Sequence, residues 1–97
     1  MNIVFRPSAL DELAEIRNWY ESHARGLGDA FMRSVQAALS QITRFPLASP
    51  RVDPDVRKTV LRKFPYALFH AVENDGVIVL GCVHQSRNPI HWPHLDH

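Results

Sequence analysis

Residues 66–83 read YALFHAVENDGVIVLGCV, and this stretch decides the fold. Its two apolar halves, residues 66–72 and 77–83, are rich in residues that favour β-strands. The polar turn between them contains an Asp-Gly pair suited to positive φ angles, so the stretch predicts a β-hairpin. Because residues 77–83 are nearly all apolar, the second strand should be a central strand that is covered on both faces.

Two helices are predicted before the hairpin. The first should begin after Ser8, which the pattern indicates as its N-cap, and should end near His23 or Ala24, before two glycines. Asp29 opens the second helix, and Pro46 ends it. Because only a few residues separate the two helices, they should form an antiparallel hairpin. The second helix has one continuous apolar stripe, formed by Phe31, Val35, Ala38, Leu39, Ile42 and Phe45.

Two further strands complete the expected fold. Residues 2–6 are β-rich, and residues 56–62 form a basic, β-favouring segment after a proline-containing loop at residues 46–55. The order is therefore strand, two helices and three strands. It predicts an α+β domain in which the helical hairpin packs on a small, mainly antiparallel sheet. Residues 1–97 should form a single domain, with residues 84–97 as a loop and tail.

The composition narrows the class of protein. A chain of 97 residues with 45% hydrophobic and 22% charged residues is typical of one soluble globular domain. No apolar run is long enough to span a membrane and no secretory signal is evident, so a cytoplasmic protein is expected. Cys82 is the single cysteine and should be a small buried hydrophobe. No glycine-rich phosphate loop or paired thiol is present, so no cofactor is predicted.

Basic residues are concentrated in the middle of the chain. Residues 31–72 contain seven Lys or Arg and two Asp, although the net charge of the whole chain is only +1. The basic strand could be a solvated edge strand that charge protects from aggregation. It could also contact phosphates or the carboxylates of a partner. The sequence leaves both interpretations open.

A second group of polar residues follows the apolar strand. His84 could transfer a proton near neutral pH, and Arg87 could hold an anion. Alternatively, this is a polar loop in which His84 caps a backbone carbonyl. The histidines of the tail match no structural zinc pattern, so no metal site is predicted. The histidines considered are His84, His91, His94 and His97, and Asp96 could add an oxygen ligand.

The two tryptophans are expected to have packing roles. Trp19, in the first helix, should contribute to packing rather than to recognition. Trp92 should hold the tail against the sheet.

Three segments in this order resemble the ParE/RelE superfamily of toxins. Residues 9–20 (ALDELAEIRNWY) are similar to the first helix of the superfamily. Residues 62–66 (RKFPY) and residues 83–92 (VHQSRNPIHW) resemble the ParE branch, and the resemblance covers residues 2–92.

The resemblance implies the toxin of a type II toxin–antitoxin pair, of the kind associated with plasmid stabilisation. A ParE-like toxin inhibits DNA gyrase and replication, has no enzymatic activity of its own, and is neutralised by a cognate antitoxin. A RelE-like toxin instead cleaves mRNA on the ribosome, and His84, Arg87 and Arg62 would then be catalytic. An inactive homologue that only binds antitoxin is the second alternative. Ala67 and Trp92 stand where the ribonuclease branch tends to have a cation and a proton-transferring side chain, which favours gyrase.

The resemblance also suggests two sets of site residues. A disordered antitoxin segment could fold into a groove between the helices and the sheet, and the toxin alone should not bind DNA sequence-specifically. The candidates for target binding are Arg62, Tyr66, His84, Arg87 and Trp92. The candidates for antitoxin binding are Leu13, Arg17, Tyr20, Arg57 and Lys58.

Overall fold

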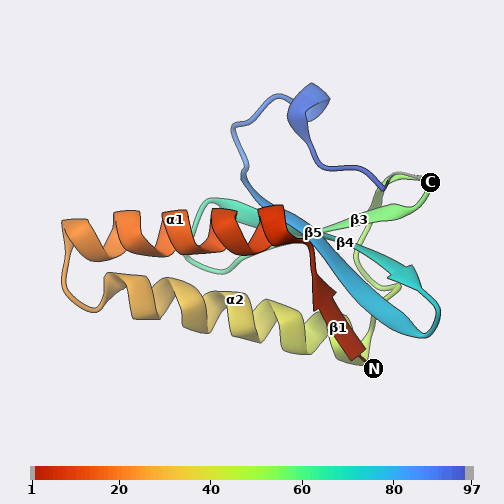
Figure 1. Ribbon diagram of the computed structural model, residues 1–97, viewed down its shortest axis with the longest axis horizontal. Helices are drawn as coiled ribbons and strands as arrows, with labels where there is room; N and C mark the ends of the chain where they lie inside the picture. Colours follow the sequence, from red (N-terminus) through yellow and green to blue (C-terminus); the bar gives the residue numbers. More distant parts are fainter. Residues whose placement is uncertain (1, 96–97) are drawn as a thin grey trace.

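The computed structural model describes residues 2–95 and has the predicted α+β architecture (Figure 1). The predicted order of one strand, two helices and a strand run is confirmed, with one short additional strand in the loop before the basic strand. The elements are β1 (Asn2–Phe5), α1 (Pro7–His23), α2 (Leu27–Arg44), β2 (Arg51–Asp53), β3 (Val56–Val60), β4 (Tyr66–Glu73), β5 (Gly76–His84) and a 3-10 turn at Pro89–His91.

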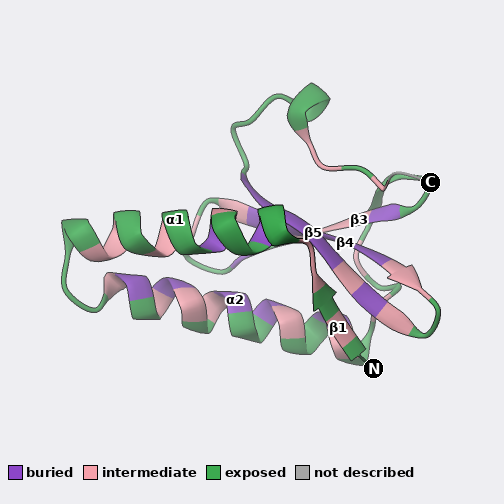
Figure 2. Cartoon of the chain, in the orientation of Figure 1, coloured by how far each residue is buried: buried purple, intermediate pink, exposed green. Residues whose placement is uncertain are grey.

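The strands form one sheet in the order β1-β5-β4-β3-β2. β1 pairs in parallel with β5, and every other neighbouring pair is antiparallel. β5 is therefore an interior strand with a neighbour on each side and, as predicted, is buried along almost its whole length. Figure 2 shows this burial, together with the buried face that α2 presents to the sheet.

Each face of the sheet has its own hydrophobic core. Under the helices, buried residues of α1 and α2 such as Leu13 and Phe31 pack on Leu68 and Val79. On the other face, the tail covers the sheet, and the Trp92 ring lies 5.2 Å from the ring of Phe69. Trp92 thus holds the tail against the sheet, as the sequence predicted.

The predicted helix starts were wrong in both helices. Ser8 is not the N-cap of α1, because the helix begins at Pro7, whose fixed φ suits the first helical position. α2 begins at Leu27 rather than Asp29, after Gly26 at a φ of +86°. The carboxylate of Glu21 accepts the backbone N–H groups of Gly26 and Gly28, at 3.1 and 3.0 Å, so α1 itself caps the start of α2.

The turn of the β4–β5 hairpin has the predicted place and a different distribution of φ angles. The positive φ angles belong to Asn74 (48°) and Asp75 (64°), and not to an Asp-Gly pair. Gly76 is already paired with Glu73 in the ladder, so the two-residue loop is Asn-Asp, which tolerates this conformation.

His70 is a completely buried histidine on β4. Its Nε2–H donates to the carbonyl of Pro46 at 2.9 Å, and Nδ1 has no hydrogen-bond partner among the described residues. Burial lowers the pKa of His70; the bond to Pro46 opposes this shift, and the charge of Arg57 adds to it. The ring is therefore neutral in the folded protein.

This burial predicts that the protein loses stability in mild acid. Below its ordinary pKa of about 6.5, His70 takes up a proton in the unfolded chain before it does so in the folded protein. The free energy of unfolding should therefore fall by on the order of 1 kcal/mol per pH unit below that value. Urea unfolding at neutral and mildly acidic pH measures this loss. His70→Gln should show a smaller loss, and an equal loss would assign the effect to other groups.

Candidate functional site

The end of β5 and the start of β4 place Tyr66 and His84 side by side. The two residues are paired across the ladder, and their rings meet edge to face with centroids 5.1 Å apart. Leu80 is an extra residue in β5 at the register shift of this pair of strands. Val79, just before Leu80, faces the helices, and Cys82, two residues after Leu80, faces them as well. This bulge therefore places His84 on the helix side of the sheet.

A cavity of about 190 Å³ opens beside this pair. Helix α1 forms one wall and the end of β5 forms the other, with Arg87 from the loop beyond it. The residues that line the cavity are Glu12, Glu15, Ile16, Tyr66, Cys82, Val83, His84 and Arg87. Three of the five predicted target-binding residues, Tyr66, His84 and Arg87, therefore meet at one site.

Glu12 is a site residue that the sequence analysis missed. β1 ends at Phe5, which pairs with Val79, so no strand lies beside Cys82 on that side of β5. The backbone N–H of Cys82 donates instead to Glu12 Oε1 at 3.1 Å. Burial raises the pKa of Glu12, while this bond and the positive charge of Arg87 oppose the shift. The available signal was a carboxylate one helical turn before the apolar Ile16.

The hydrogen bonds of His84 fix its tautomer. Its Nδ1 accepts the backbone N–H of Ser86 at 3.0 Å, and the hydroxyl of Ser86 lies 2.8 Å from the same nitrogen. The neutral ring therefore has its proton on Nε2, which can donate a hydrogen bond. Residues 85–88 do form an exposed polar turn, as one interpretation predicted, but the His84 ring accepts a backbone N–H there instead of capping a carbonyl.

Two other groups in the cavity stay protonated. Burial raises the pKa of Tyr66, so its hydroxyl remains a donor at neutral pH. Burial also raises the pKa of Cys82 to about 12, and the charge of Glu12 adds to this shift. The thiol is thus unreactive and buried, as predicted.

The other two predicted target-binding residues lie outside the cavity. Arg62 is exposed in the loop before β4, where its carbonyl accepts the hydroxyl of Ser34 at 2.8 Å. Trp92 lies on the opposite face of the sheet, where Lys58 Nζ is 4.8 Å from the centre of its ring.

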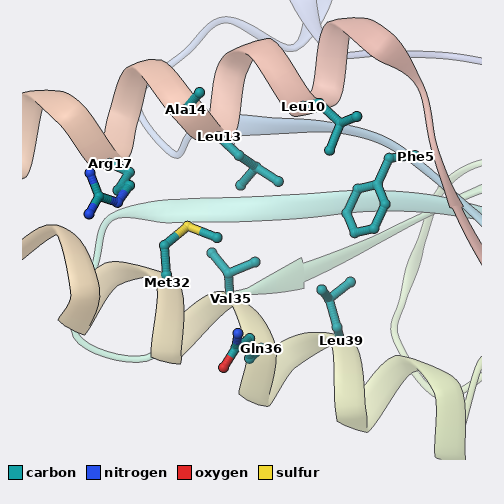
Figure 3. Close-up of a pocket in the computed structure, with 9 residues that line it drawn as sticks. All are labelled: Phe5, Leu10, Leu13, Ala14, Arg17, Met32, Val35, Gln36 and Leu39. Carbon is teal, nitrogen blue, oxygen red and sulfur yellow. The ribbon is translucent and has the colours of Figure 1, made fainter.

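A larger cavity, an apolar groove of about 410 Å³, lies between α1, α2 and β1 (Figure 3). Most of its wall is aliphatic or aromatic, and Leu10 is 51% exposed there. Arg17 lines one end and pairs with Asp29 at 3.3 Å. The lining residues are Phe5, Leu10, Leu13, Ala14, Arg17, Met32, Val35, Gln36 and Leu39.

The predicted antitoxin-binding residues are distributed over three places. Leu13 and Arg17 line the groove. Tyr20 turns toward the other site, and its ring centre lies 6.3 Å from that of Tyr66. Arg57 is used within the fold, because it donates to the carbonyls of Leu47 and Ser49 at 2.8 Å each, and Lys58 packs on Trp92.

The described part of the chain gives no sign of a metal centre or a membrane span. Among residues 2–95, no group of three His, Cys, Asp or Glu side chains could hold a metal ion. Asp96 and His97, considered above as ligands, lie outside the described residues. No described helix combines the length and apolarity needed to cross a bilayer.

The sequence identifies the family. Residues 3–89 match the family described as the ParE toxin of the type II toxin–antitoxin system parDE, and the chain belongs to this family. It is thus a ParE-type toxin of a type II toxin–antitoxin system. No curated protein matches the chain.

Solved structures share the fold. The chromosomal ParDE system of P. aeruginosa is 18% identical with a TM-score of 0.63, over 87% of this chain and 95% of that chain. The isolated E. coli RelE toxin is 22% identical with a TM-score of 0.65, over 93% and 89%. The intact E. coli RelBE toxin–antitoxin complex is 23% identical with a TM-score of 0.65, over 89% and 98%.

Proposed function

We propose that this toxin arrests growth by binding DNA gyrase in the cytoplasm through the surface formed by Tyr66, His84 and Arg87. The observation that carries the proposal is the hydrogen bonding of His84, which leaves a donor, Nε2–H, directed away from Ser86. Together with the Tyr66 hydroxyl and the Arg87 guanidinium, the site presents donors to a partner. A set of donors suits the carbonyls and carboxylates of a protein surface.

The same geometry leaves His84 and Tyr66 poorly suited to act as the base of a ribonuclease. Cleavage by attack of a 2′-hydroxyl needs a base that accepts its proton. His84 has its lone pair engaged by Ser86, and Tyr66 is held protonated. Ala67, at the position where the ribonuclease branch tends to have a cation, is buried beneath the tail, where a charge would be costly.

Pulse labelling after induction of the toxin without antitoxin tests this function. Incorporation of a DNA precursor should fall first while incorporation of an amino acid continues. His84→Ala should weaken inhibition of gyrase supercoiling about 10-fold, as expected for the loss of one hydrogen bond and one ring contact. His91→Ala, in the exposed tail, is the matched control. An early stop of translation with DNA synthesis intact would contradict the proposal.

A RelE-like ribonuclease is the second candidate, and Glu12 is the observation that favours it. A carboxyl with a raised pKa beside an arginine is a group that could serve as a general base. Under this alternative, the wild-type protein should cleave mRNA in a translating extract and leave gyrase supercoiling unchanged, and Glu12→Gln should abolish the cleavage.

We further propose that the cognate antitoxin covers the apolar groove of Figure 3. An amphipathic antitoxin helix would bury Leu10 and its aliphatic neighbours, and a carboxylate near its end would pair with Arg17. The presence of an antitoxin in the solved RelBE complex, which has the same fold, supports a partner of this kind. Tyr20, Arg57 and Lys58 lie outside this groove.

A further inference from the structure

Trp19 is exposed, and the rings of two neighbouring residues contact its indole. Its predicted packing role fits poorly with this position, because 56% of the residue is exposed. The ring of His23 lies against it, with centroids 3.9 Å apart and the planes tilted by 31°, and the ring of Tyr20 meets it edge to face at 5.1 Å. His23 is itself fixed, because its Nδ1–H donates to the Trp19 carbonyl at 2.7 Å. A surface tryptophan whose ring is already in contact with its neighbours loses less conformational entropy on binding than a free one.

A series of ring contacts connects Trp19 to the candidate target site. From Trp19 the contacts pass to Tyr20, then to Tyr66 at 6.3 Å, and from Tyr66 to His84 at 5.1 Å. Glu15 forms a second connection, since it lines the cavity and lies one helical turn before Trp19. One partner could therefore cover the cavity and Trp19 together.

The chemistry of this surface favours a cationic side chain. The face of an indole ring attracts Arg and Lys, and the exposed carboxylate of Glu15 would attract the same charge. Glu12 lies in the same cavity wall and adds a second carboxyl group. The carboxyl groups of Glu12 and Glu15 along this side of α1 disfavour the phosphates of a nucleic acid.

We propose that Trp19 and Glu15 bind an Arg or Lys side chain of the target protein, and that they extend the target-binding surface along α1. This inference rests on the proposed function in that the neighbouring cavity contacts the target. The partner is a polypeptide that places a basic residue close to a segment that binds Tyr66 and His84.

Two variants test the contact, with purified DNA gyrase as the probe. Trp19→Ala should weaken inhibition of supercoiling about 30-fold, as for an aromatic hot spot. Glu15→Lys should weaken it about 10-fold, because the reversed charge repels a basic side chain. The matched controls are Phe45→Ala, which removes an exposed aromatic ring elsewhere, and Asp11→Lys, which reverses an exposed charge on α1. Both controls should retain the potency of the wild-type protein.

The outcomes separate this inference from the proposed function. Wild-type potency of Trp19→Ala or of Glu15→Lys overturns the inference, and higher potency of Glu15→Lys indicates a nucleic acid and overturns it as well. Melting curves identify any variant that fails to fold. If Trp19→Ala fails to fold, the result for Glu15→Lys, a substitution at an exposed position, decides whether the contact exists. If the wild-type protein leaves gyrase active, the proposed function fails, and the same variants are ranked by growth arrest in cells. Loss of arrest in both variants, with intact controls, still supports the contact; full arrest overturns it.

Discussion

Phe31→Ala should lower the free energy of unfolding by about 3–5 kcal/mol. Phe31 is completely buried and lies between the helices and the sheet, with its ring 5.6 Å from Tyr20, 5.4 Å from Phe64 and 5.9 Å from Tyr66. The substitution leaves a cavity where three aromatic rings meet. A loss of this size is a large part of the roughly 5–15 kcal/mol that stabilises a small domain. Urea unfolding followed by circular dichroism measures it.

Phe45→Ala is the matched control for this prediction. Phe45 lies just beyond the end of α2 and is 55% exposed, so its loss should change the free energy of unfolding by about 0.5 kcal/mol or less. Similar losses in both variants would show that Phe31 is not the centre of the aromatic core. Phe31→Ala should also weaken target binding, since Tyr66 packs against the missing ring.

Leu10→Glu should produce a toxin that its cognate antitoxin no longer neutralises. Leu10 is half exposed in the groove, so the free protein tolerates a carboxylate there. In the complex, the carboxylate would be buried against apolar side chains without a partner, which should weaken binding by about 2 kcal/mol or more. Co-expression with the antitoxin should therefore fail to restore growth, and titration calorimetry gives the change in Kd.

Leu47→Glu is the control, because Leu47 is 64% exposed and does not line the groove. It should remain fully neutralised. If the antitoxin neutralises Leu10→Glu equally well, the groove is not its binding site.

Most of the regular elements were predictable because they have a local hydrophobic pattern. The stripe of α2 and the apolar strand β5 can be recognised without tertiary information. β2 was not predicted, since it has only three exposed residues within a segment that contains several prolines. The start of α2 was misplaced because its cap is Glu21, a side chain of the other helix.

The candidate site was only partly predictable, for a similar reason. His84 and Arg87 follow a strand, where polar side chains stand out in the sequence. Glu12 did not stand out, because a carboxylate at the edge of the apolar face of a helix usually extends into solvent. Its inward position depends on where β1 ends and on the bulge at Leu80, and both are determined by strand pairing across most of the chain.

The parallel pairing of β1 with β5 gives this protein an order of assembly during translation. β1 is the first strand to be synthesised, and its only partner in the sheet is the last strand, so β1 remains unpaired until Gly76–Val79 have been synthesised. Translation proceeds at about 5–20 residues per second, so the last residue of α2 is synthesised seconds before Gly76. The cavity needs His84 and Arg87 and forms last. A nascent chain released early, by a nonsense codon or a stalled ribosome, would therefore contain the residues of both helices and lack those of the surface that we assign to the target.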